Sequence, residues 1–149
     1  MPMSATFDTA VLANWLGDLQ EDVQQALRPA AQAGAQVLYQ TVLRNVPVSA
    51  KGHWFHGTSY KTTGKKYWFD AGTLRKAIYQ VHSADNSGPT QQTYHVSWNH
   101  KKAPYGFMVE YGTARGARPV AFVRRAASSQ PAALDAAQAK FFATLKHFS

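Results

Sequence analysis

The first 46 residues carry a helical repeat of apolar side chains that a single proline interrupts. Apolar residues recur three and four positions apart on both sides of Pro29, which is the pattern of an amphipathic helix. They are Leu12, Trp15, Leu16, Leu19, Val23, Ala26 and Leu27 before the proline, and Ala35, Leu38, Tyr39, Val42 and Val46 after it. Proline lacks a backbone N–H, and its ring crowds the preceding turn. We therefore expect one long helix that is kinked or broken at Pro29.

The ends and the middle of this helix have residues suited to their positions. Asp8 or Thr9 would accept hydrogen bonds from the free N–H groups of the first turn, and Pro47 ends the pattern. Small residues crowd the middle of the helix, at Ala30, Ala31, Ala33, Gly34 and Ala35. They suit a close helix contact, either between subunits or inside one domain, and the sequence leaves both open.

Two strands are expected near the centre of the chain. Residues Ile78 to Ser83 form the first. In the second, Tyr94, Val96 and Trp98 alternate with Thr93, His95, Ser97 and Asn99, which is the period of a strand with one buried face. The residues 85–89, Asp-Asn-Ser-Gly-Pro, have the turn chemistry to join them as an antiparallel hairpin. Upstream, Gly72-Thr73-Leu74-Arg75 predicts a turn that opens into a short element.

Shorter elements are expected towards the C-terminus. Pro104 suits the start of a short helix that runs to Glu110 or Tyr111 and is closed by Gly112 in a left-handed conformation. Pro119 is expected to begin a brief helix or strand. Pro131 suits the first turn of a final helix, with Ser128 and Ser129 as caps. The apolar face expected for this helix consists of Leu134, Phe141, Leu145 and Phe148.

These patterns predict an α+β fold for the whole chain. A small antiparallel sheet packs against the long N-terminal helix and a C-terminal helix, and a long loop protrudes from it. A chain of 149 residues buries roughly two-thirds of its unfolded surface, which is enough for a core of its own. With no internal repeat and no boundary signal, residues 1–149 are expected to form a single domain.

Residues 49–70 are the expected protruding arm. This segment has no clear period but is rich in lysines and aromatic residues. They are Lys51, Trp54, Phe55, Tyr60, Lys61, Lys65, Lys66, Tyr67 and Trp68. Long irregular segments inside small domains are uncommon and are usually functional or disordered. We expect an extended arm or a loose hairpin.

Charge is distributed unevenly along the chain. The net charge is +8, yet the first 27 residues contain Asp8, Asp18, Glu21 and Asp22 and no lysine or arginine. Three interpretations remain open: a solvated basic surface, an acidic N-terminal part that meets the basic surface of a neighbouring subunit, and a nucleic-acid partner.

The sequence shows no set of residues typical of a catalytic or metal-binding site. The chain has no cysteine, which excludes thiol catalysis and thiolate metal sites. His53 and His56 lack further ligands, and a site built from His82, His95 and His100 lacks an acid to join it. No phosphate-binding glycine loop occurs, and no carboxylates pair. We expect no enzyme, no metal and no cofactor. No apolar run approaches the roughly 20 residues of a membrane helix, and no signal peptide is expected.

Three segments resemble the small neck, or minor tail-component, family of long-tailed bacteriophages. The first is Gly72 to Ile78, which follows the long helix ending at Pro47. The second is Ala103 to Thr113, with Tyr, Val-Glu, aromatic, Gly and Thr in register. The third is Ala117 to Ala126. The resemblance covers about Ala26 to Phe148. The chain departs from the family pattern at Ala71, at Val120-Ala121-Phe122, and in the length of residues 49–70.

The resemblance implies a non-enzymatic virion protein. Such a protein forms a ring, expected to be a hexamer, that helps to join the head connector to the tail or completes the tail as a terminator. The expected partners are other copies of the chain and neck, connector and tail-tube proteins, and genomic DNA passes through the ring without specific binding. Assembly would take place in the bacterial host cytoplasm, without a membrane. We expect Tyr105, Phe107, Val109 and Phe122 to lie in the core rather than in an interface.

The residues expected at subunit or partner interfaces are basic, aromatic or acidic. They are Trp54, Phe55, Tyr60, Lys65, Lys66, Trp68, Glu110, Arg115, Arg118, Arg124 and Arg125. For Glu110, burial against an arginine is the alternative. The alternative function is a basic nucleic-acid-binding module, in which aromatic residues between Lys51 and Trp68 stack on bases while lysines hold phosphates.

Overall fold

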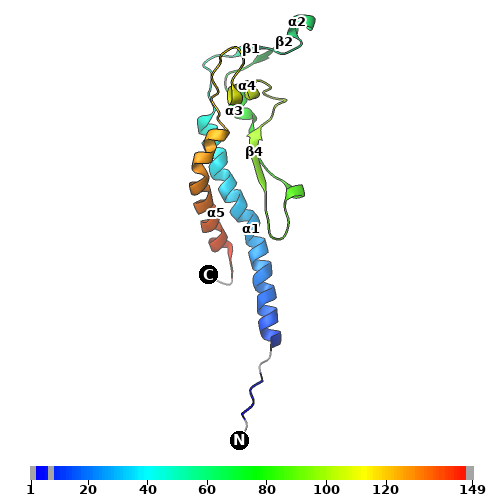
Figure 1. The fold of residues 1–149 in the computed structure, drawn as a ribbon, viewed down its shortest axis with the longest axis vertical. Coiled ribbons are helices and arrows are strands. Elements are labelled where there is room, and N and C mark those ends of the chain that lie inside the picture. The colour runs from blue at the N-terminus through cyan, green and yellow to red at the C-terminus, as the bar shows by residue number, and fades with distance from the viewer. Residues whose placement is uncertain (1–2, 7–8, 147–149) are drawn as a thin grey trace.

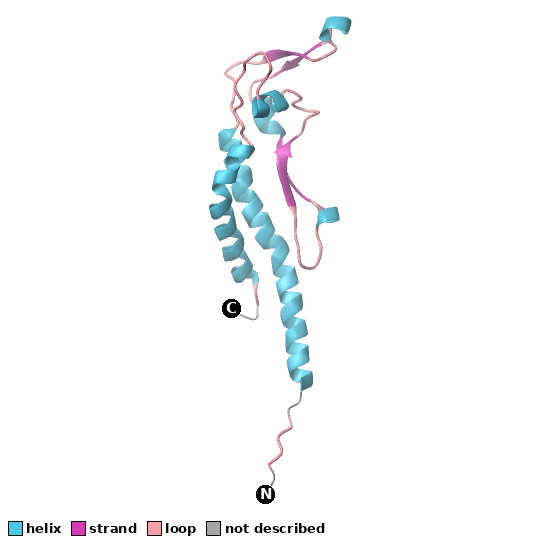
Figure 2. Cartoon of the chain, viewed as in Figure 1, coloured by secondary structure: helices cyan, strands magenta, loops and turns pink. Residues whose placement is uncertain are grey.

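The computed structural model describes residues 3–6 and 9–146, which form an elongated molecule (Figure 1). Helix α1 (Thr9–Asn45) runs along most of its length, and helix α5 (Gln130–Thr144) lies antiparallel beside the middle and upper part of α1. Short elements gather around the C-terminal end of α1 (Figure 2). The fold is α+β, as predicted.

Helix α1 continues through Pro29, so of the two expected outcomes, a kink or a break, the break does not occur. Ala26 and Ala30 flank the proline and are buried on the side of the helix that faces α5. This packing offsets the hydrogen bond that Pro29 cannot donate. The helix begins at Thr9 and ends before Pro47, while Asp8 lies outside the described residues.

The contact between α1 and α5 depends on small residues. A Cβ atom placed on Gly34 would lie 3.1 Å from the carbonyl oxygen of Ala133 and 3.4 Å from the Cβ of Ala137. The small residues in the middle of α1 therefore serve packing within the chain. At the far end of α5, a carboxylate oxygen of the buried Asp22 accepts a hydrogen bond from the backbone N–H of Lys146 at 2.8 Å.

Ser129 occupies the N-cap position of α5, as predicted, but its side chain forms no capping hydrogen bond. The Ser129 hydroxyl accepts a hydrogen bond from Thr41 Oγ1 on α1 at 2.9 Å, and the Ser128 hydroxyl donates to the carbonyl of Arg125. The predicted apolar face of α5 is also wrong in part, because Leu134 is exposed whereas Ala133 and Leu145 are buried. Phe148 lies outside the described residues.

The strands form two separate hairpins rather than one small sheet. Strand β3 (Ile78–His82) pairs with β4 (Tyr94–Trp98) as the predicted antiparallel hairpin, and its register places Ile78 opposite Trp98. Strand β1 (His53–His56) pairs antiparallel with β2 (Lys66–Phe69), so residues 49–70 fold as a hairpin that projects from the upper end of the molecule (Figure 1). The 3₁₀ helix η1 (Ala84–Asn86) lies in the turn between β3 and β4.

Short helices complete the upper end. Helix α2 (Tyr60–Thr63) lies at the tip of the arm, and α3 (Thr73–Ala77) follows Gly72, whose φ is +80°. Helix α4 (Gly106–Tyr111) begins two residues after Pro104. The 3₁₀ helix η2 (Arg124–Ser129) leads into α5, and residues 117–121, around Pro119, are irregular rather than helix or strand.

The main core lies where the C-terminal end of α1 meets α3, β3 and η2. Its buried side chains are Val42, Val46, Leu74, Ala77, Ile78, Ala103, Phe122 and Ala126. Phe122 is fully buried, and its ring packs edge-on against Trp98 with 5.4 Å between ring centroids. Burial of one such side chain stabilises the fold by about 1.5–3 kcal/mol. The core thus holds together the three segments that carry the family resemblance.

Candidate subunit interface

Glu110 is the most tightly bound of the predicted interface residues. Its side chain is 1% exposed and accepts three hydrogen bonds: from the backbone N–H of Val123 at 2.9 Å, from that of Arg124 at 3.1 Å, and from Arg124 Nε at 3.0 Å. In return, Arg124 Nη2 donates to the Glu110 carbonyl at 2.8 Å. The carboxylate therefore joins α4 to the start of η2.

This geometry withdraws Glu110 from the candidate interface, because its side chain is enclosed by its own chain. Burial against an arginine, the alternative interpretation, is what the structure has. Arg124 holds Glu110 yet remains 55% exposed, and its guanidinium lies over the Tyr111 ring at 4.7 Å. Arg124 is thus fixed in place while part of it stays accessible to a partner.

The exposed side of α4 forms an aromatic and basic surface that we call the α4 patch. Phe107 is 61% exposed, so its predicted place in the core is wrong, and its ring contacts that of Tyr111 at 4.7 Å between centroids. The other predicted core residues lie inward: Phe122 is buried, and Tyr105 and Val109 pack against the core. The α4 patch consists of Phe107, Met108, Tyr111, Arg115, Arg118 and Arg124.

A tight loop after α4 carries Arg115 and Arg118. Gly112 was predicted to adopt a left-handed helical conformation. Its φ is positive, at +80°, but its ψ of −176° is that of extended backbone. The loop returns through a hydrogen bond from Thr113 N–H to the Ala117 carbonyl, and Val120 N–H then donates to the Val109 carbonyl. Both arginines are exposed at the end of α4, and neither forms an ion pair within the described residues.

The arm has two different faces. On its inner face, the rings of His53, Phe55 and Phe69 surround Tyr105, with centroid distances of 4.7, 6.1 and 5.0 Å. Phe55 is therefore half-buried and anchors the arm to the body. Burial raises the pKa of the Tyr105 phenol, and a hydrogen bond with the backbone of Leu74 lowers it in part.

The outer face of the arm presents the two tryptophans. Trp54 and Trp68 are each half-exposed and pack edge-on at 5.3 Å between centroids. Lys66 Nζ lies over the Trp54 ring at 4.5 Å, and Trp68 Nε1 donates to Asp70 at 2.9 Å. A Cβ atom on Gly52 would lie 2.3 Å from the Trp68 ring, so the indole rests on the backbone at this glycine. Both tryptophans are thus held in place before any partner binds.

The remaining arm and loop residues are placed less specifically. Tyr60 is exposed at the tip of the arm, and its ring lies 4.3 Å from that of His56. Lys65 is exposed beside it, and Arg125 is exposed on η2. These residues are accessible, but the structure does not draw them into one cluster.

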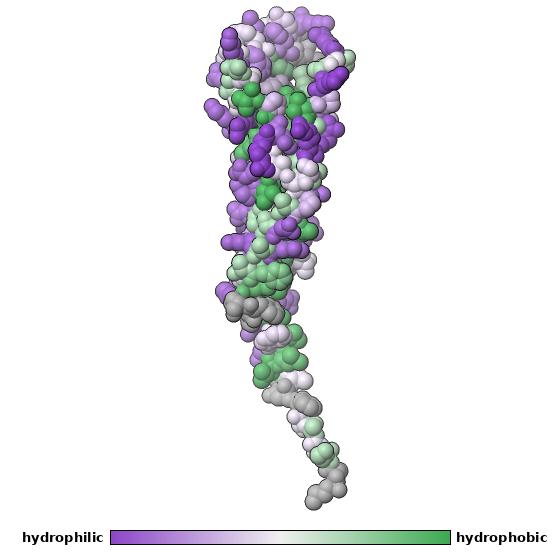
Figure 3. Space-filling model, turned by 90° about the vertical axis from the view of Figure 1, so that its left-hand side faces the viewer, coloured by the Kyte–Doolittle hydropathy of each residue, from purple (hydrophilic) through white to green (hydrophobic). Residues whose placement is uncertain are grey.

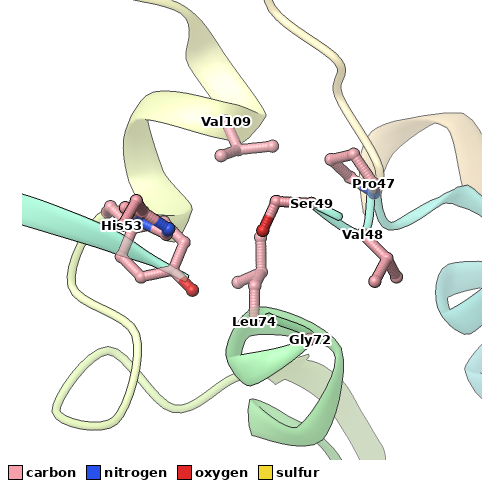
Figure 4. A pocket seen from close by; sticks show the side chains of 8 residues that line it. Pro47, Val48, Ser49, His53, Gly72, Leu74 and Val109 are labelled. Carbon is pink, nitrogen blue, oxygen red and sulfur yellow. The ribbon is translucent and has the colours of Figure 1, made fainter. Parts of the chain in front are cut away.

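A cavity of about 290 Å³ lies between the base of the arm, α3 and α4 (Figure 4). Its lining is mostly apolar, and its polar groups come from Ser49, His53 and Tyr105. Among the described residues, no hydrogen bond links Ser49 to His53, and no acid lines the cavity. The arrangement therefore does not activate the serine hydroxyl as a nucleophile in the way that a triad requires.

The N-terminal part of α1 carries an uncovered apolar surface that the sequence pattern placed against a core. Val11, Leu12, Trp15 and Leu16 are 70%, 55%, 45% and 51% exposed. In Figure 3, hydrophobic residues gather along this lower part of the molecule, and hydrophilic residues are concentrated around its upper end. Contiguous exposed apolar patches usually mark sites of interaction with another molecule.

The described part of the chain offers no group of three or more His, Asp or Glu side chains that could hold a metal ion. Within that same part, no helix has both the length and the apolar character needed to cross a membrane. Comparison of the chain with protein-family models, with curated proteins and with solved structures finds no match in any of the three.

Two exposed apolar surfaces were not predicted from the sequence, and the reason is the same for both. Both the stripe of α1 and the side of α4 that carries Phe107 and Tyr111 are apolar at helical spacing. Such spacing defines a face but does not say what covers it. On α4, the opposite side, with Gly106, Val109 and Glu110, is the one that packs inward. A second apolar face on so short a helix is the signal that points to an interface.

Proposed function

We propose that this chain is a non-enzymatic structural protein of a tailed phage or prophage virion. It acts at the neck or at the head-proximal end of the tail, as a ring-forming subunit, expected to be a hexamer. The ring helps to join the head connector to the tail. Assembly takes place in the host bacterial cytoplasm, and the genomic DNA passes through the ring without specific binding.

The observation that carries this proposal is the exposure of large apolar side chains at both ends of an elongated chain. Leu12 and Trp15 lie at one end, and Trp54 and Trp68 lie at the other. Such surfaces suit a protein whose exposed apolar side chains become buried when it binds other subunits. The three segments that resemble the neck family also meet in one core, through Leu74, Val109 and Phe122.

The test is deletion of the gene in the phage or prophage that carries it, followed by electron microscopy of the lysate. We expect DNA-filled heads and separate tails that fail to join, and rescue when the chain is supplied in trans. Purified protein, alone or mixed with tails, should form rings in negative stain and in native mass spectrometry. Normal infectious particles from the deletion strain would contradict the proposal.

The outer face of the arm is the proposed docking element towards the connector or the tail. Removal of all of residues 49–70 would uncover Tyr105, so we choose the substitutions Trp54→Ser and Trp68→Ser, which leave the inner face intact. Neither tryptophan belongs to the main core, so we expect the body of the protein to stay folded, as near-native circular dichroism would show, while joining is lost. Tyr79→Ser with Val81→Ser, exposed residues on β3, is the matched control. Full joining activity of the tryptophan variant would exclude the arm.

Nucleic-acid binding remains the second candidate, favoured by one observation. The arm lysines Lys51, Lys61, Lys65 and Lys66 are exposed, and none of them pairs with an acid in the described part of the chain. If they held phosphates, the affinity for DNA would fall steeply as salt rises. Fluorescence anisotropy with single- and double-stranded DNA over a salt series tests this, and absence of binding at low salt removes the candidate.

A further inference from the structure

The uncovered stripe on α1 continues the seam that α5 covers higher up. Leu19, Ala26 and Ala30 are spaced seven and four residues apart, so they share one face of the helix. Ala26 and Ala30 are buried in the seam, but α5 ends at Thr144, and the following Lys146 already binds Asp22. The stripe from Leu12 to Leu19 therefore lies beyond the reach of α5 in its own chain.

The same part of α1 is acidic. Asp18 and Glu21 are exposed there, and the first 27 residues contain no lysine or arginine. A partner for this surface must offer apolar area together with positive charge. This chain contains such a surface at its other end, in the α4 patch.

The α4 patch matches this requirement in both chemistry and charge. Phe107, Met108 and Tyr111 supply exposed apolar area, while Arg115 and Arg118 supply guanidinium groups that are not paired within the described chain. The one acid of α4, Glu110, is buried and satisfied by its own chain. Arginine and tyrosine are the residues that most often anchor protein interfaces.

We propose that the N-terminal part of α1 of one copy docks on the α4 patch of the next copy. Leu12, Trp15 and Leu16 would cover Phe107 and Tyr111, while Asp18, three residues from Trp15 at the edge of the stripe, faces Arg115 and Arg118. The two surfaces differ, so the contact is heterologous and repeats from copy to copy, as a closed ring requires. The inference rests on the proposed ring-forming function and specifies the interface that builds the ring.

Pairing of two α1 stripes is the competing arrangement. It would cover the same leucines but would bring two acidic ends together, because among the described residues Lys146 is the one basic residue that lines the pocket with Asp18, Glu21 and Asp22. It would also close on itself as a two-fold dimer, which leaves no surface of this kind for a third copy. Charge complementarity therefore favours the α4 patch of another copy as the surface that covers the stripe.

Cross-linking between copies distinguishes the two arrangements, because the chain contains no cysteine of its own. Gln20→Cys lies one turn beyond Leu16, and Ala114→Cys lies in the loop after α4; both positions are exposed. With a short bis-maleimide, we expect the mixture of the two variants to give covalent dimers, and neither variant alone to do so. A chain with both cysteines should give a ladder of higher oligomers. Dimers of Gln20→Cys alone, or no cross-links at high concentration, would overturn the proposal.

Charge reversal tests the same contact by a different route. Arg115→Glu with Arg118→Glu should weaken self-association by about tenfold or more, and Asp18→Lys with Glu21→Lys should do the same. An equimolar mixture of these two variants restores opposite charges at both contacts between unlike copies, and we expect association to recover with the two variants alternating. Lys101→Glu with Lys102→Glu is the control for the arginine variant, because it changes the net charge by the same amount at two exposed residues outside the patch.

The result can be separated from the fate of the proposed function. If the arginine variant associates and joins heads to tails as the control does, the interface is wrong while the neck function stands. If the native chain is dispensable for particle assembly, the function itself fails, whatever the cross-links report. The measurements are sedimentation velocity for self-association and particle counts in complemented lysates for joining.

Discussion

At the scale of single residues, Glu110 links two of the three sequence motifs, because its carboxylate binds Val123 and Arg124. One carboxylate satisfies two backbone N–H groups and one guanidinium that come from residues 13 and 14 positions further along the chain. A buried carboxylate is stable only when such donors replace its water. The clamp fixes the turn that carries Phe122 into the core, and it also fixes Arg124 beside Tyr111.

Loss of this carboxylate should destabilise the fold strongly. Glu110→Ala leaves the backbone N–H groups of Val123 and Arg124 without acceptors in a partly buried site, and we expect a loss of about 3 kcal/mol in the free energy of unfolding. Urea denaturation followed by circular dichroism measures it. Asp135→Ala, an exposed acid on α5, is the control and should change the free energy by less than about 0.5 kcal/mol. Equal stability of the two variants would refute the role of the clamp.

Gly112 offers a second test, based on backbone conformation. Its φ of +80° with ψ of −176° is a combination that is essentially restricted to glycine, and a Cβ would lie 2.6 Å from the Ala117 carbonyl oxygen. Gly112→Ala should therefore lower the free energy of unfolding by at least about 2 kcal/mol. Gly116→Ala, with φ +101° and nothing within 4 Å, tests strain alone and should lower it by about 1 kcal/mol. A larger effect at Gly116 would contradict this account.

Residue roles were predictable from the sequence only where one type of residue has one common use. The turn at Gly72 followed from the special conformations open to glycine. Glu110 was expected at an interface, and its burial against an arginine was the alternative that its apolar neighbours suggested. Ser129 takes the predicted N-cap position, but its hydroxyl does not cap the helix, because a hydroxyl that suits a cap can equally bind a neighbouring helix, as Ser129 binds Thr41. Which of these occurs depends on packing that sequence spacing does not contain.

At the scale of elements, the molecule depends on the seam between α1 and α5. This seam keeps α1 intact through Pro29 and is closed at its lower end by Asp22. Helices α1 and α5 and the β3–β4 hairpin were predictable, because their periodicities extend over several residues, whereas α2 in the arm was not predicted. Of the kink or break expected at Pro29, the break does not occur, since tertiary packing of Ala26 and Ala30 outweighs the local preference.

Close packing at Gly34 yields a prediction for this seam. A leucine there must displace Ala133, whose carbonyl oxygen already lies 3.1 Å from the position of a Cβ. Gly34→Leu should lower the free energy of unfolding by about 2–3 kcal/mol. Gly17→Leu, on the same helix with nothing within 4 Å, should raise it by up to about 1 kcal/mol through helix propensity. Thermal unfolding at low concentration compares them, and a shift in the same direction for both would argue against the packing explanation.

At the scale of the whole molecule, the core and the proposed interfaces occupy different regions. The core lies at the upper end, around Val42 and Phe122, whereas the stripe with Leu12 and Leu16 lies beyond α5 at the lower end. The sequence pattern made no distinction between them, because both are apolar at helical spacing. Folding and assembly should therefore be separable by substitution, which is not possible when one surface serves both.

Leu12→Gln with Leu16→Gln should abolish self-association without unfolding the protein. Glutamine has nearly the helix propensity of leucine, and both side chains are more than half exposed, so the free energy of unfolding should change by less than about 0.5 kcal/mol. Val42→Ala, at a site 1% exposed, should behave in the opposite way and lose about 2 kcal/mol while associating normally below its melting temperature. Sedimentation velocity and urea denaturation of the same samples give both quantities. If the glutamine variant lost both stability and association, the stripe would belong to the folding core, and the acidic end of α1 would need another explanation than a contact with the next copy.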